Sequence, residues 1–158
     1  MYANDDVDIL NDLIWATLDS ARHYRRVAGN IGSLRIRAVF DHLSTQRSRV
    51  AQTLQHQVAT FGGVHLADGF SVIHTTHVFG NLRYAMDYGY CALIDEVERG
   101  EEHVRAKYEC ALENERLSQL SRTVVMSVYP SVREGFDEMH ALKRYPNDEL
   151  IHDERLRH

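Results

Sequence analysis

Mostly apolar residues recur at alternating steps of three and four along four long stretches of this chain. The first stretch carries them at Val7, Leu10, Ile14, Thr17, Ala21, Tyr24 and Ala28. Such steps return to the same side of an α-helix, so each stretch has one continuous seam. The 158 residues include only two prolines, which leaves room for long helices and argues against a turn-rich β fold. The pattern therefore predicts an all-α protein built from packed helices.

Capping residues and glycines divide this pattern into five expected helices. Four are long, and the third is short and has a weaker seam. In order, they run from Asn4 to Gly29, from Ser33 to Gly62, over about residues 71–86, from Asp87 to about Glu113, and over about residues 116–144.

The order of long and short helices suggests a topology. The two long helices before the short one should pair as a hairpin, and so should the two after it. A short helix that runs back along the bundle would let the second and fourth helices point the same way. We therefore expect a ferritin-like four-helix bundle with a short crossover helix between helices two and four. It should form a single domain over residues 1–145, followed by a polar tail over 146–158.

Several short segments along the chain also match a known family. The residues concerned are Leu10-Asn11-Asp12-Leu13-Ile14, Gln46-Arg47, Phe61-Gly62-Gly63, Glu98-Arg99-Gly100-Glu101-Glu102, Tyr108 and His140. In this joint pattern the chain resembles bacterial ferritin-like proteins of unknown function, over residues 8–144. Pro130 in the last helix departs from the family pattern. The resemblance implies the bundle fold and little chemistry, because that family has no settled activity.

Charge and chain ends exclude several classes of protein. The net charge of -5 argues against nucleic-acid binding by bulk charge. The acidic start MYANDDVDILND does not resemble an export signal, and no window approaches the ~18 apolar residues that cross a bilayer. Five arginines between Arg22 and Arg37 surround the first hairpin turn. They are expected to be solvated, with an anion or acidic partner as the alternative.

The two cysteines, Cys91 and Cys110, are expected on one helix. Their separation of 19 residues corresponds to about 28 Å of helix, too far for a disulfide. We expect two reduced thiols in a cytoplasmic protein that contacts neither nucleic acid nor membrane.

A ferritin-like bundle raises the question of a di-iron site, which needs four carboxylates and two histidines in Glu-x-x-His pairs. Reflecting each expected hairpin about its turn aligns the mid-helix polar residues of the four long helices. The resulting core polar layer is Thr17, Arg47, Glu101 and Ser127. It holds one carboxylate, and the fixed positive charge of its arginine repels iron.

In place of that metal site we expect an ion pair between Arg47 and Glu101, because a buried charge without a partner is costly. The alternative is that both side chains extend out of the seam to water.

The ten histidines offer two pairs with metal-ligand spacing. Asp137 and His140 lie three residues apart on the last helix, and His74 and His77 lie three apart on the short one. Ordinary solvated side chains are the expected state of both pairs, and a contribution to a metal site is the alternative. No nucleophile elbow or phosphate loop is present, so no catalytic residue is assigned and an enzyme is not expected.

Two hypotheses follow for function. The first is a non-catalytic ferritin-like bundle that acts as a structural, stress-related or interaction module without a cofactor. Apolar residues beside the seams suggest a homodimer or small homo-oligomer. These residues are Trp15, Leu18, Phe70, Val78 and Phe79. The alternative is a metal-binding protein that handles iron or another divalent metal.

Overall fold

The computed structural model describes residues 2–62 and 88–144, and every long helix predicted from the sequence lies within these ranges. The helices are α1 (Tyr2–Asn30), α2 (Leu34–Thr60), α4 (Tyr90–Glu113) and α5 (Gln119–Arg144). The described part of the chain contains no strand, so the all-α prediction is confirmed. The short helix expected within residues 71–86 and the tail expected over 146–158 lie outside the described residues.

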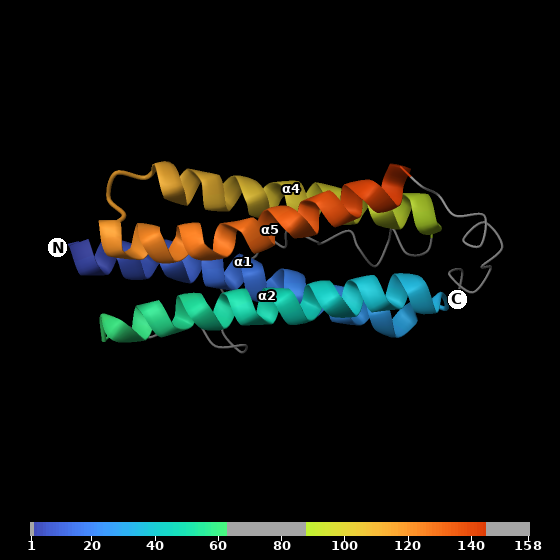
Figure 1. The fold of residues 1–158 in the computed structure, drawn as a ribbon, viewed down its shortest axis with the longest axis horizontal. Helices are drawn as coiled ribbons and strands as arrows, with labels where there is room; N and C mark the ends of the chain where they lie inside the picture. The colour runs from blue at the N-terminus through green and yellow to red at the C-terminus, as the bar shows by residue number, and fades with distance from the viewer. Residues whose placement is uncertain (1, 63–87, 145–158) are drawn as a thin grey trace.

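The four helices pack side by side as a bundle of two hairpins (Figure 1). α1 and α2 run in opposite directions and form one hairpin, and α4 and α5 form the other. α2 and α4 run in the same direction, which is the orientation that a crossover topology requires.

Apolar seams from all four helices meet in one core, as their spacing predicted. Leu10, Phe40, Val104 and Val132 are fully buried there. Trp15 is also buried, at 7% exposure, and Leu18 is partly buried against the same core. Trp15 therefore packs within its own bundle, and its use as a sign of a homodimer surface was wrong. An apolar residue beside the seam is buried here because the packed face is wider than the seam.

The helix ends agree with the expected caps in part. The Ser33 hydroxyl accepts a hydrogen bond from the backbone N–H of Ile36 at 3.4 Å and begins α2, as expected. Gly62 follows α2 with φ of 67°, a conformation that favours glycine. α1 continues through Gly29, and Gly89 is the residue that precedes α4. Asp87, the cap expected from the sequence, lies outside the described residues.

The start of α5 is capped by a side chain from the other end of the sequence. Asp6 on α1 is fully buried and accepts a hydrogen bond from the backbone N–H of Ser118 at 2.8 Å. The same carboxylate accepts from the hydroxyl of Ser121 at 2.6 Å and from the hydroxyl of Ser118. This contact satisfies a helix-terminal N–H and places negative charge at the positive end of the α5 dipole.

Arg122 ties the end of α4 to the beginning of α5. Its guanidinium donates to the carbonyl of Leu112, to that of Asn114 at 2.8 Å and to that of Leu117 at 3.1 Å. α5 begins well beyond the point where α4 ends, so its first turns project past the hairpin partner (Figure 1). This offset sets which residues of α5 reach the centre of the bundle.

None of the helices that the structure describes carries an apolar stretch long enough to cross a bilayer.

Candidate functional site

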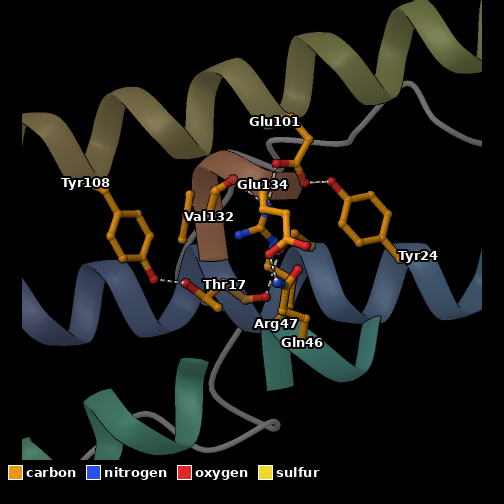
Figure 2. A network of polar contacts seen from close by, with 9 residues as sticks. Thr17, Tyr24, Gln46, Arg47, Glu101, Tyr108, Val132 and Glu134 are labelled. Atoms are coloured by element: carbon orange, nitrogen blue, oxygen red, sulfur yellow. Dashed lines mark hydrogen bonds and ion pairs between the residues drawn. The ribbon is translucent and has the colours of Figure 1, made fainter. Parts of the chain in front are cut away.

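A buried pair of opposite charges lies at the centre of the bundle. Arg47 on α2 and Glu101 on α4 are both 0% exposed, and Nη2 of Arg47 donates to Oε2 of Glu101. The same nitrogen donates to the backbone carbonyl of Val132 on α5 at 3.3 Å. The other carboxylate oxygen accepts from the hydroxyl of Tyr24 on α1. One network therefore joins all four helices (Figure 2).

A second buried contact joins α1 to α4 beside this pair. The hydroxyl of Thr17 donates to the carbonyl of Leu13 at 2.7 Å and also meets the hydroxyl of Tyr108 (Figure 2). Because the proton of Thr17 goes to Leu13, Tyr108 is the donor in the second hydrogen bond. Thr17 is thus buried at the centre, but its partner is a tyrosine rather than the ion pair.

Three of the four residues expected in the core polar layer are brought together, namely Thr17, Arg47 and Glu101. The assignment of Ser127 to this layer was wrong. Ser127 is exposed and its hydroxyl donates to the carbonyl of Val124 at 2.6 Å on its own helix. The atoms of α5 that reach the pair belong to Val132 and Gly135.

The offset between α4 and α5 explains this error. A hydrogen bond joins Tyr129 to Glu109, and the guanidinium of Arg105 lies 4.4 Å from the centre of the Phe136 ring. In a symmetric hairpin, residues equally far from the turn on α4 and α5 would contact each other. In both of these contacts the α5 residue is about two helical turns farther from the turn than that. The sequence could not reveal this shift, because the Asp6 and Arg122 contacts that accompany it are long-range or depend on the turn.

Gly135 provides the space that the guanidinium occupies. A β-carbon at this position would lie 2.5 Å from Nη2 of Arg47 and 3.3 Å from Oε2 of Glu101. Even the smallest side chain would therefore displace the buried pair.

Replacing Gly135 with alanine is expected to lower the free energy of unfolding by about 1–2 kcal/mol, because overpacking outweighs the gain in helix propensity. Chemical denaturation followed by circular dichroism measures this change. In an Arg47→Leu/Glu101→Leu background the obstructing guanidinium is gone, so the same substitution should cost much less. Equal losses in both backgrounds would contradict the steric explanation.

Burial dominates the electrostatics of the centre. It raises the pKa of Glu101 well above its usual value, and the nearby Glu138 carboxylate adds to the rise. The guanidinium contact acts in the opposite direction, since it favours the charged carboxylate. Burial also lowers the pKa of Arg47 to about 10 and raises the pKa of Tyr108 to about 12. Arg47 therefore remains a cation at neutral pH.

These residues do not fit a di-iron centre of the kind that the fold expected from the sequence can hold. The central network contains one carboxylate, two tyrosines, a threonine and an arginine. The cation of Arg47 lies where metal ions would have to bind, and two of its nitrogens, Nε and Nη1, are buried without a hydrogen-bond partner. A guanidinium in this position repels a metal ion and donates no lone pair.

The two metal-ligand pairs expected from the sequence are placed only in part. Asp137 is exposed, and His140 is partly buried. The His140 ring stacks on Phe136, and its Nδ1 lies 3.8 Å from Oε1 of Glu98 on α4. His74 and His77 lie outside the described residues. Metal binding by either pair stays a prediction.

A different group of potential ligands was missed. His42 on α2 and Glu134 and Glu138 on α5 each offer a ligand atom, and these three atoms lie within 4.8 Å of one another. The sequence pattern gives His42 no ligand partner, because its partners come from a helix distant in sequence. The available signal was the i,i+4 spacing of the two glutamates, which places both on one face of α5.

The comparisons with known proteins identify a family without an assigned activity. A family model described as a domain of unknown function, DUF2383, matches residues 5–114, which is more than half of the chain. The chain belongs to the DUF2383 family. No curated protein shows significant similarity to it.

The DUF2383 match covers three of the four described helices. It includes α1 from Asp5 onward, α2 and α4, and it ends at Asn114, the residue that caps α4. Arg47 and Glu101 are therefore inside the matched region. The α5 residues that complete their surroundings lie beyond it.

Proposed function

We propose that this DUF2383 chain is a non-catalytic ferritin-like bundle that serves as a structural or interaction module and forms a small homo-oligomer. The observation that carries this proposal is the buried Arg47–Glu101 pair at the level where a ferritin would hold metal. Both side chains are fully buried, so the polar centre of the bundle is closed to substrates.

The ferritin-like assignment is supported by helix direction. Two antiparallel hairpins with parallel α2 and α4 are the arrangement of bundles that have one long crossover connection. In a simple up-down-up-down bundle α2 and α4, as consecutive long helices, would be antiparallel and would need only a short loop between them. Here 29 residues separate Thr60 from Tyr90, which is the longer kind of connection.

The proposed oligomer is supported by apolar side chains at one end of the bundle. Leu34 is the first residue of α2 and is 77% exposed, and Tyr88 precedes α4 and is 66% exposed. α2 and α4 begin at the same end (Figure 1). Two large apolar side chains exposed at a shared end are suited to an isologous contact with a second copy.

Light scattering coupled to size-exclusion chromatography tests this contact. The wild-type chain should have a mass that is a small multiple of its 18.2 kDa. Leu34→Glu should shift the mass toward a single chain, because it places like charges across a two-fold contact. Met126→Glu is the matched control, since Met126 is also exposed but lies on α5. A wild-type monomer would contradict the oligomer.

Metal analysis tests the non-catalytic centre. Protein produced with iron in the medium and purified without chelator should carry no iron that depends on Glu101. Glu101→Gln keeps a carbonyl acceptor for Arg47, so this variant separates metal binding from loss of the fold. Near-stoichiometric iron that disappears in Glu101→Gln would overturn the proposal.

A further inference from the structure

Three potential metal ligands meet on the outside of the bundle, between α2 and α5. Nε2 of His42 lies 3.9 Å from Oε1 of Glu138, and a carboxylate oxygen of Glu134 completes a group within 4.8 Å. His42 and Glu134 are exposed, and Glu138 is partly buried. This group shares no residue with the buried pair, although Glu138 is close enough to influence the pKa of Glu101. No part of the proposed function depends on the group.

We propose that His42, Glu134 and Glu138 bind one divalent transition-metal ion, with Zn²⁺ as the best match, and thereby join α2 to α5. One imidazole nitrogen and two carboxylate oxygens are ordinary zinc ligands. Around a tetrahedral ion with bonds of about 2.1 Å, neighbouring ligand atoms lie about 3.4 Å apart. The 3.9 Å between His42 and Glu138 needs to shrink by about 0.5 Å, and distances up to 4.8 Å by at most about 1.4 Å, which side-chain rotation supplies. The imidazole favours zinc, cobalt or nickel over magnesium or calcium.

The charge around the group favours a cation. Glu134 and Glu138 lie four residues apart on the same helix, where like charges repel each other. The nearest buried cation, Arg47, already contacts Glu101 and therefore does not neutralise both surface glutamates. A divalent ion would relieve this repulsion.

Gln46 supports the group from the next turn of α2. Its Nε2 donates to Oε2 of Glu134 at 3.1 Å, which orients that carboxylate (Figure 2). Its Oε1 is buried and has no hydrogen-bond partner. A water molecule bound to the metal could donate to this oxygen. Supporting contacts of this type are characteristic of metal sites.

A cavity beside His42 leaves one side of the group open. It has a volume of about 280 Å³ and lies between α2 and α5. Polar side chains line much of it, including Thr45, Gln46 and Ser131, and the cationic Arg49 lines it as well. This space accommodates water or another small ligand beside His42, the one proposed ligand that lines it.

The bundle contains a matched pair that lacks the third ligand. Nδ1 of His140 lies 3.8 Å from Oε1 of Glu98, nearly the same distance as between His42 and Glu138. In the described residues, only the group at His42 brings three potential ligands together. His140→Gln is therefore the appropriate control for His42→Gln.

Titration calorimetry with ZnCl₂ tests the proposal on the full chain after chelator treatment and dialysis. All variants carry His74→Gln and His77→Gln, which removes the other candidate histidine pair. We expect one Zn²⁺ per chain, with affinity lowered more than about tenfold by His42→Gln or Glu138→Gln. Gln46→Ala should weaken binding by about tenfold, the usual effect of losing a supporting contact. His140→Gln should leave the affinity unchanged.

Two outcomes would overturn the proposal. One is zinc binding that is unaffected by His42→Gln, Glu134→Gln and Glu138→Gln. The other is that the chain carrying only His74→Gln and His77→Gln binds no more zinc than the same chain with His42→Gln added. The three ligands are exposed or partly buried, and circular dichroism verifies that each variant is folded. If metal binding depends on His42 but not on Glu101, the proposed function stands. If iron binding depends on Glu101, the proposed function is contradicted but the zinc site at His42 is not.

Discussion

Replacing Glu101 with leucine is expected to lower the free energy of unfolding by about 3–5 kcal/mol, the usual cost of breaking a buried ion pair. The substitution leaves the Arg47 guanidinium fully buried, with the Val132 carbonyl at 3.3 Å as its remaining acceptor. It also removes the acceptor of the Tyr24 hydroxyl. Urea denaturation of both proteins, followed by circular dichroism, measures the difference.

The double variant Arg47→Met/Glu101→Leu is the decisive control. Replacing both members of a buried pair with apolar residues of similar size is often neutral or stabilising. The double variant should therefore recover most of the stability lost in Glu101→Leu. If its loss equals the sum of the two single losses, Arg47 and Glu101 do not interact as the geometry indicates.

Replacing Asp6 with alanine should cost about 3 kcal/mol, since hydrogen bonds to a charged group contribute about 1.5–3 kcal/mol. The Asp6 carboxylate is fully buried and accepts from one backbone N–H and two hydroxyl groups. Its loss leaves these donors unsatisfied at the start of α5. Thermal and chemical unfolding both report the change.

Asp6→Asn is the matched variant for this prediction. The amide keeps one oxygen acceptor and the size of the side chain, but its NH₂ group faces donors rather than acceptors. An intermediate loss is therefore expected. A loss in Asp6→Ala below 1 kcal/mol, or one equal to that of an exposed residue such as Asp8→Ala, would show that the contact does not anchor α5.

Much of the fold could be predicted because its signals are local. The three- and four-residue steps place Leu10, Ile14 and Phe40 on the buried faces of their helices, and each is fully buried. Ser33 marked the beginning of α2 through its own hydrogen bond to Ile36. Such features depend on neighbours within one turn or on burial of one helical face, so a single sequence contains them.

The residues of the candidate site could be predicted only where they occupy seam positions. Arg47 and Glu101 are polar residues at seam positions, so their contact followed from the need to pair a buried charge. Tyr24 and Tyr108 are also seam residues, but their spacing does not reveal that their hydroxyls complete the network. Ser127 was misplaced because the offset of α5 changes every contact across that hairpin.

The sequence by itself determined the helical class, the buried face of each long helix and the presence of a charged pair among the seam residues. These follow from helical periodicity and from the cost of burying unpaired charge. Only the tertiary structure decided the register of α5 against its neighbours. That register places Gly135 against the guanidinium of Arg47 and brings Glu134 and Glu138 to His42. A shift of one helix along another leaves its own periodicity unchanged, so no local pattern records it.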